Sequence, residues 1–177
     1  MLCFVLYLGH LLNPGASHEQ GALFLDSFFR NVLNLPFSHD TVSYYKIREE
    51  LATASLGRLD IFMSFIYDGR PKAIVIENKI YAADQEQQLT RYHRYLTSVL
   101  NLSPEDYWLF YLTPQGTSPS TNAIDPESAK QLQQDQCLFN ISYRQHITNW
   151  LNDCYPRVSS PRVQHALYQY LTILPTL

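Results

Sequence analysis

The sequence has 177 residues, of which 46% are apolar, and this content excludes disordered and fibrous proteins, which lack the apolar surface needed for a core. A chain of this length is most simply one soluble globular domain, residues 1–177, that buries roughly 70% of the surface its unfolded form exposes. Because the formal net charge is −3, there is no global attraction to nucleic acid, and any such binding must rest on a local basic face.

The N-terminal segment MLCFVLYLGHLLNPGAS is apolar and has no Lys or Arg after Met1. It is too short to span a bilayer, so no membrane association is predicted. Two interpretations remain, a secretion signal and a buried first helix that ends at Asn13, Pro14 and Gly15. The buried helix is the favoured interpretation.

Three cysteines, Cys3, Cys137 and Cys154, are odd in number and have neither the short paired spacings of a zinc site nor the density of a disulfide scaffold. We expect all three to be buried thiols that act as small hydrophobic side chains. Free buried thiols of this kind are typical of a protein in a reducing cytoplasm.

Helical spacing of apolar residues predicts a second helix over 17–33. Ser17 is its expected N-cap, and Gln20 stands where a capping box places Glu or Gln. Loose alternation over 41–51 then gives a weaker strand signal.

Two stronger strands are predicted over 59–67 and 72–80, and the Asp68-Gly69 dipeptide between them favours a tight hairpin turn. Helical periodicity returns after Asp84, an expected N-cap, and continues to Leu100. The remaining predicted elements are a strand over 107–112, a loop or lid over 113–128, a strand over 138–143, and helices over 144–154 and 161–174.

The hairpin turn fixes which residues face each other across the two strands. If Tyr67 pairs with Arg70, the same register places Asp60 opposite Glu77, with Cβ atoms about 5 Å apart. Two carboxylates at that separation repel each other. Lys79 lies two residues beyond Glu77 and therefore projects from the same face.

The opposite face of this hairpin is expected to be core. Alternation assigns to it a set of five apolar residues, Leu59, Ile61, Met63, Ile74 and Ile76.

Asp60, Glu77 and Lys79 admit two interpretations. One is a neutral ion cluster on a half-exposed sheet, worth about 0 to 1 kcal/mol. The other is a site for a hard divalent cation such as Mg²⁺, which takes one or two carboxylates, keeps several waters and leaves room for a phosphate oxygen. The backbone carbonyl of Asn78 can add a ligand, and Lys79 can orient or deprotonate an attacking water.

Several motifs in this region resemble those of the PD-(D/E)XK nuclease superfamily. They are Gly57-Arg58-Leu59-Asp60-Ile61, Ile76-Glu77-Asn78-Lys79, Asp84-Gln85 and Gln88-x-x-x-Tyr92. The chain is especially similar to a group of prokaryotic and phage proteins with an IENKIYA-x-DQ-x-x-QL-x-RY signature. LLNPGASHEQG and ISYRQHITNWLNDC also look like that group, so the resemblance covers most of the chain.

The resemblance implies an α+β, restriction-endonuclease-like fold with a central mixed sheet flanked by helices in the order αβββαβ. It also implies a Mg²⁺- or Mn²⁺-dependent nuclease that hydrolyses phosphodiester bonds in nucleic acid, usually DNA, with a role in phage defence or phage-borne processing. By matching positions, Asp60 and Glu77 would hold the metal, and Lys79 would serve the water and the transition-state charge. Gln88 and Tyr92 would lie beside the metal.

A third acid is usual in such sites, and Glu49, Glu50 and Glu19 are the candidates. Alternation permits only one of Glu49 and Glu50 to point inward, and Glu19 stands early in its predicted helix. Arg91 and Arg94, on a more exposed arc of the helix after Asp84, are candidate phosphate contacts.

Two other functions compete with a nuclease. The first is a catalytically impaired nuclease-fold module for nucleic-acid binding or protein assembly, acting with partners or as one half of a homodimer. The second, a sugar hydrolase using Asp60 and Glu77, is discounted because Lys79 would depress both pKa values and leave no proton donor. Relatives, as the likeness suggests, extend further at both ends, so the chain is expected to be a shortened form.

Overall fold

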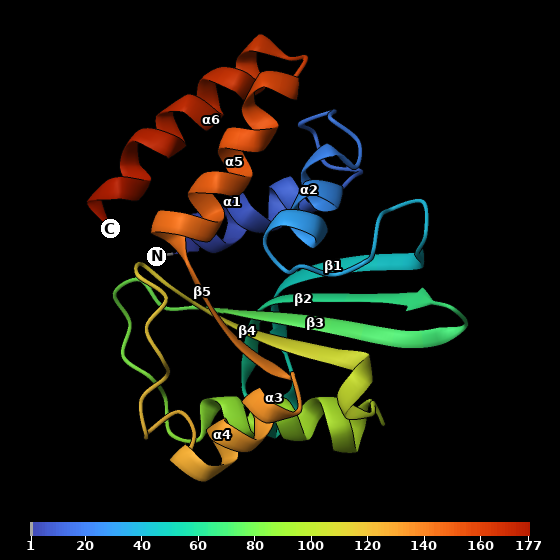
Figure 1. The fold of residues 1–177 in the computed structure, drawn as a ribbon, viewed down its shortest axis with the longest axis vertical. Coiled ribbons are helices and arrows are strands. Elements are labelled where there is room, and N and C mark those ends of the chain that lie inside the picture. Colours follow the sequence, from blue (N-terminus) through green and yellow to red (C-terminus); the bar gives the residue numbers. More distant parts are fainter. Residues whose placement is uncertain (1) are drawn as a thin grey trace.

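The computed structural model describes residues 2–177, with side chains from residue 4 onward. Its centre is a five-stranded sheet in the order β1-β2-β3-β4-β5, antiparallel from β1 to β3 and parallel from β3 to β5 (Figure 1). The predicted α+β class, a mixed sheet flanked by helices in the order αβββαβ, is confirmed. The strands are β1 (Ser43–Ala52), β2 (Arg58–Tyr67), β3 (Arg70–Asn78), β4 (Tyr107–Thr113) and β5 (Leu138–Ser142).

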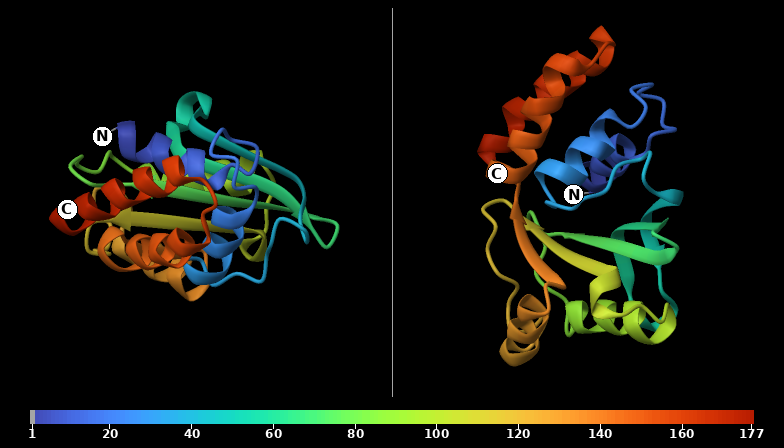
Figure 2. Two further views of the ribbon diagram at one scale, coloured as in Figure 1. Left: turned by 90° about the horizontal axis from the view of Figure 1, so that it is seen from above. Right: turned by 45° about the vertical axis from the view of Figure 1, so that its right-hand side comes forward.

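Helices form a layer on each face of the sheet, as Figures 1 and 2 show. One layer packs through a large apolar cluster, centred on Trp150 and Phe28, against the sheet face that carries Ile61 and Ile76. The other packs against the face that carries Phe62 and Val75. The first layer contains α1 (Leu2–Leu12), α2 (Leu23–Asn31), α5 (Thr148–Cys154) and α6 (Pro161–Ile173), and the second contains α3 (Gln88–Arg94) and α4 (Pro126–Gln134).

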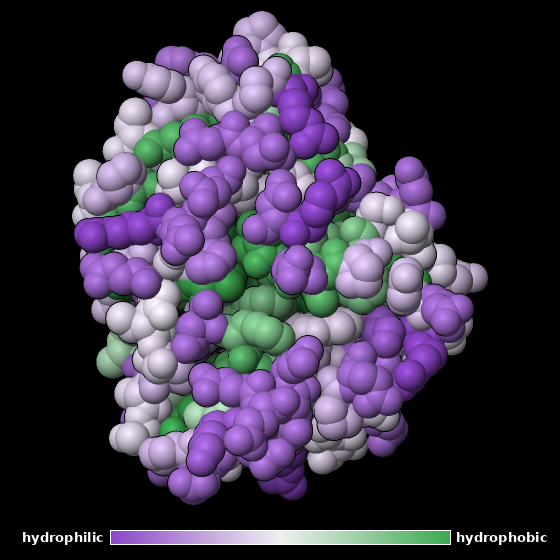
Figure 3. All heavy atoms as spheres, in the orientation of Figure 1, coloured by the Kyte–Doolittle hydropathy of each residue, from purple (hydrophilic) through white to green (hydrophobic). Residues whose placement is uncertain are grey.

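Hydropathy follows this layering. Figure 3 shows hydrophilic side chains over the outer helices, and hydrophobic ones reaching the surface mainly in a band across the middle of the molecule. Within the described part of the chain, no helix is both long enough and apolar enough to cross a membrane. Cys137 and Cys154 are buried free thiols, as predicted, whereas the side chain of Cys3 lies outside the described residues.

The β2–β3 hairpin has the predicted register. Tyr67 pairs with Arg70, and the pairing continues without a shift to Ile61 and Ile76. Asp68 and Gly69 have φ values of 50° and 71°, the two left-handed residues that a type I′ turn requires. The paired residues end there, one position short of Asp60 and Glu77, and Asp60 instead accepts a hydrogen bond from the backbone N–H of Asn78.

Side-chain alternation breaks at one point of the β1–β2 pair. Glu49 pairs with Ile61 and Leu51 with Leu59, yet Ile61 belongs to the first apolar cluster and Leu59 to the second. The prediction that Leu59 shares a face with Ile61 was therefore wrong. The cause is local, because Glu50 lies between the two pairs with a left-handed φ of 54°, which redirects the strand.

Three helix predictions also differ from the structure. The second helix begins at Leu23 and not at Ser17, because the chain between them forms turns in which Glu19 and Gly21 have positive φ. The helix expected after Asp84 begins only at Gln88 and ends in a π-helical turn, Tyr95–Val99. Helix α4 was not predicted; it begins at Pro126, within the last residues of the expected loop over 113–128, and continues to Gln134.

Candidate active site

Five predicted site residues come together at the end of the β2–β3 hairpin. Asp60 lies on β2, Glu77 on β3, and Lys79 directly after β3, while Gln88 and Tyr92 enter from α3. All but Asp60 are buried. A cavity of about 260 Å³ opens beside them, lined in part by Glu50, Arg58, Asp60, Glu77, Lys79 and Gln88.

Gln88 connects the polar side chains of this site. Its amide nitrogen donates to Glu77 Oε1 and to the Tyr92 hydroxyl, each at 2.8 Å, and its amide oxygen accepts from Lys79 Nζ at 2.8 Å. Lys79 Nζ also lies 2.9 Å from Glu77 Oε1. The i and i+4 spacing of Gln88 and Tyr92 on α3 places both beside the same carboxylate, and the predicted grouping is therefore present.

Asp60 is less constrained than Glu77. Its Oδ2 accepts from the backbone N–H of Asn78 at 2.9 Å, whereas its Oδ1 has no hydrogen bond to any residue that the structure describes. The Asn78 side chain points elsewhere and accepts from the Tyr143 hydroxyl at 2.9 Å. One carboxylate oxygen of Asp60 thus remains available to a ligand in the cavity.

Burial disfavours the charged form of both carboxylates. Burial, together with the negative charge of Asp60, raises the pKa of Glu77 to about 7, although Lys79 opposes the shift. Burial also raises the pKa of Asp60, with a further contribution from Glu50. The pKa of Tyr92 is raised by burial and by Glu77, so its hydroxyl stays protonated. Such a site gains from a bound cation.

Of the three candidates for a third acid, Glu50 lies in the cavity. Its left-handed backbone turns the side chain toward Asp60, and Arg58 forms an ion pair with it at 2.5 Å. The Glu49 carboxyl packs instead against Gly9 of α1, where a Cβ would come within 2.3 Å of Glu49 Oε1. Glu19 lines a different pocket, between α1 and α6.

Asp84 does not cap a helix but ties three segments together. It accepts from the Tyr111 hydroxyl at 2.9 Å and from the backbone N–H of Ser120 at 3.0 Å, and it lies 4.0 Å from Lys79 Nζ. Burial opposes its charge, but these hydrogen bonds prevail and lower its pKa. The register could have indicated Tyr111, which pairs with Glu77 across β3 and β4, once the parallel alignment was known.

The two arginines proposed as phosphate contacts differ in how they are engaged. The guanidinium of Arg91 donates to the carbonyl oxygens of Leu56 and Glu86 and to the side chain of Gln85. It thereby holds the β1–β2 connection against α3. Arg94 is exposed and makes no such bond with the described residues.

The donor set fits a hard divalent cation. No group of three or more His, Cys, Asp and Glu side chains in the described chain is placed to hold a metal by itself. Mg²⁺, however, needs only one or two carboxylates and completes its shell with waters and phosphate oxygens. Asp60 and Glu77 could supply these carboxylates. Burial raises the pKa of both, with a further contribution from Asp60 at Glu77 and from Glu50 at Asp60, and a cation would relieve this cost of holding negative charge.

A family model for the PD-(D/E)XK nuclease superfamily matches residues 7–172 of the chain. The match spans every strand of the sheet and all five residues of the candidate site. No curated protein and no solved structure shows significant similarity to the chain.

Proposed function

Because the chain belongs to the PD-(D/E)XK nuclease superfamily, we propose that it is a metal-dependent nuclease that hydrolyses phosphodiester bonds in nucleic acid, with DNA as the first substrate to test. One observation carries this proposal. Two carboxylates that repel each other share a cavity with a buried amine, and this arrangement is costly unless the site binds a cation. A purely structural ion cluster would need no cavity beside it.

Asp60 and Glu77 would hold the metal, with the backbone carbonyl of Asn78 as a further ligand and Glu50 as the third acid. Members of this superfamily generally use divalent metal ions, and Mg²⁺ or Mn²⁺ would supply Lewis-acid polarisation of a phosphoryl oxygen and a lower pKa for a water. The choice of Glu50 over Glu49 and Glu19 rests on its place in the cavity.

Lys79 and α3 would position the reacting groups. Lys79 Nζ would place a positive charge beside the attacking water and the oxygens on which negative charge develops. Gln88 would fix Lys79 and Glu77 relative to each other, since it bonds both. Tyr92 would orient Glu77 through the 3.0 Å contact with Oε2, because the raised pKa keeps its hydroxyl a donor.

Purified protein is expected to cleave plasmid or oligonucleotide DNA with Mg²⁺ or Mn²⁺ and to lose this activity in excess chelator. Supercoiled and linear DNA and RNA would be incubated with each ion, and products followed on gels. Absence of cleavage of every substrate with both ions, together with nucleic-acid binding that is equal with and without chelator, would instead support an impaired binding module.

Metal-free protein is expected to lose stability as pH rises through the titration of Glu77. The pKa of Glu77 is about 7 in the folded state against 4.5 ordinarily, so its contribution is fully present below about pH 4.5 and is lost as pH rises through about 7. The loss is on the order of 3 kcal/mol.

Urea unfolding of wild type and Glu77→Gln in chelator, from pH 4.5 to 8, measures this loss. The free energy of unfolding of the wild type should fall with rising pH relative to that of Glu77→Gln. Mn²⁺ should stabilise the wild type more at pH 8 than at pH 5. Parallel pH profiles for the two proteins would show that the pKa of Glu77 is the same in the folded and the unfolded protein, which would contradict the raised pKa.

A further inference from the structure

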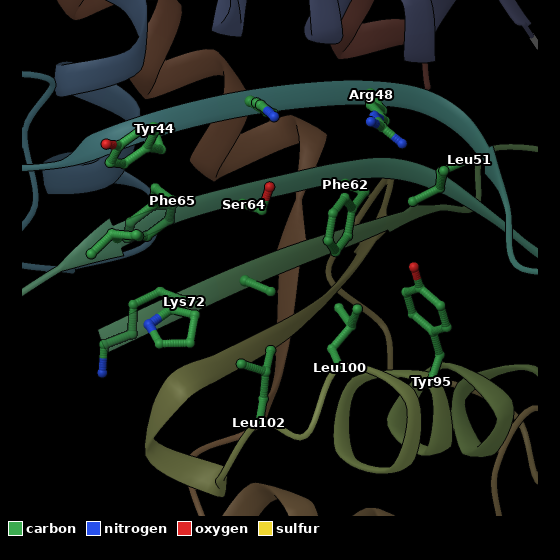
Figure 4. A pocket seen from close by; sticks show the side chains of 14 residues that line it. Tyr44, Arg48, Leu51, Phe62, Ser64, Phe65, Lys72, Tyr95, Leu100 and Leu102 are labelled. Carbon is green, nitrogen blue, oxygen red and sulfur yellow. The ribbon is translucent and has the colours of Figure 1, made fainter. Parts of the chain in front are cut away.

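A second cavity, of about 440 Å³, lies on the sheet face that α3 also covers. Figure 4 shows Tyr44 and Arg48 reaching into it from β1, with Tyr95, Leu100 and Leu102 on the opposite side. Ser64 of β2 pairs with Ala73 of β3 at its floor. These two small side chains leave space beside β1 unfilled. The result is a groove between an edge strand and the segment 95–102.

The groove is basic, unlike the chain as a whole. Among the described residues that line it, three are cationic and none is acidic. Lys72 is already paired with Asp106 at 2.6 Å. Lys46 and Arg48, in contrast, are exposed and form no hydrogen bond or ion pair with any described residue. Two cations are thus free to bind an anionic ligand.

Aromatic side chains accompany these cations. Tyr44 is 79% exposed and stands in a β-bulge, where the register shifts between Ser43 and Lys46 and its own φ is 53°. A β-bulge changes the direction in which a side chain points. A tyrosine with a left-handed backbone conformation is also strained. Tyr95 and Phe62 present further rings to the groove.

The groove leads toward the candidate active site along β1. Arg48 and Glu50 are two residues apart, a rise of roughly 7 Å, and Glu50 lines the cavity that holds Asp60 and Glu77. Beyond Glu50, the β1–β2 connection turns onto α3, where Arg91 bonds the carbonyl of Leu56. The two cavities share no lining residue, so a strand bound at the acids would reach the groove by crossing the edge of β1.

We infer that this groove binds a single-stranded segment of nucleic acid that flanks the scissile bond, an inference that rests on the proposed nuclease function. Lys46 and Arg48 contact phosphates, while Tyr44 and Tyr95 stack on bases. Proteins that bind single strands combine a basic groove with such stacking platforms.

A duplex fits this groove less well than a single strand. In a duplex the faces of the bases are stacked on one another, and only their edges reach the grooves. The rings of Tyr44 and Tyr95 would then have no partner. An acidic peptide could satisfy Lys46 and Arg48 but offers no planar groups at regular intervals for the aromatic side chains.

Binding would be measured in the inactive Asp60→Asn background, in chelator, by fluorescence anisotropy with labelled oligothymidylate and with a mixed-sequence duplex. Each phosphate contact to a single strand contributes about 0.7 to the slope of log K against log salt. Lys46→Ala with Arg48→Ala should lower that slope by about 1.4 and the affinity about 25-fold at 0.1 M salt. Tyr44→Ala should lower affinity roughly fivefold or more and leave the slope unchanged.

The matched control is Lys130→Ala with Arg162→Ala, which removes the same charge from exposed positions on α4 and α6. It should leave the slope within error of the wild type. Equal slopes for the two double variants would overturn the inference, and so would tighter binding of the duplex than of oligothymidylate. Binding of an acidic peptide that depends on Lys46 and Arg48, without such dependence for oligothymidylate, would also overturn it.

A minimal diester separates this inference from the proposed function. Bis(p-nitrophenyl) phosphate has no flanking nucleotides, so Lys46→Ala with Arg48→Ala should leave its turnover unchanged while raising KM for single-stranded DNA. If the double variant turns over the diester and its KM for single-stranded DNA equals that of the wild type, the groove is refuted and the nuclease function is not. No turnover of any substrate by the wild type would refute the nuclease function and leave the anisotropy result to decide the groove.

Discussion

Asp60→Asn is expected to lower the rate of phosphodiester cleavage by at least about 10³-fold, which corresponds to about 4 kcal/mol of transition-state stabilisation. The substitution removes the carboxylate with a free oxygen in the cavity, so a divalent ion bound there would lose a ligand. The asparagine can still accept from the backbone N–H of Asn78, as Asp60 does at 2.9 Å, and the fold should therefore be kept.

The same variant should be more stable than the wild type without metal. Removing one of two facing negative charges relieves repulsion that raises the pKa of Glu77. A gain of about 1 kcal/mol would raise Tm by about 2–4 °C in a chain of this size. Asp40→Asn is the matched control, because the Asp40 side chain is 98% exposed. A variant that cleaves at the wild-type rate, or that Mn²⁺ stabilises as much as the wild type, would contradict the metal assignment.

Lys79→Met is expected to destabilise the metal-free protein by about 3–5 kcal/mol at pH 8, the usual cost of leaving a buried charge without its partner. The Lys79 and Glu77 side chains are only 7% and 3% exposed, and their charged atoms lie 2.9 Å apart. Without the amine, the Glu77 carboxylate keeps only neutral donors. Urea unfolding measures the change, and activity should be lost as well.

Two controls identify the cause of this loss. Lys130→Met, at an exposed position of α4, should cost little. Adding Glu77→Gln to Lys79→Met should recover much of the stability, because no buried charge then remains, but should not recover cleavage. If the double variant is as unstable as Lys79→Met, lost packing and not the unpaired carboxylate is responsible.

The hairpin was predictable because a two-residue turn fixes a register. Asp68-Gly69 determined that Asp60 faces Glu77, and the period of a strand placed Lys79 beside Glu77. Helical spacing placed Gln88 and Tyr92 on one face of a helix, and the resemblance to the nuclease superfamily implied that this face meets the site. The structure brings the side chains of Glu77, Lys79, Gln88 and Tyr92 together.

Other features depended on contacts that a local pattern does not contain. The left-handed backbone of Glu50 breaks alternation, so the sequence could not choose between Glu49 and Glu50. Asp84 has the chemistry of an N-cap but bonds Tyr111 and Ser120 from distant segments. The groove was missed because the signal in β1 was weak, although Tyr44, Lys46 and Arg48 follow a period of two.

The side chains of the site all come from the segment between Glu50 and Tyr92, which forms three consecutive strands and the helix that follows. Contacts between segments close in sequence cost little loop entropy, so this stretch can order early in folding. The helices from both ends of the chain pack mainly on the far face. Changes in that outer layer, such as at Trp150, should therefore alter the lifetime of the folded protein more than its proposed chemistry, so stability and activity can vary separately.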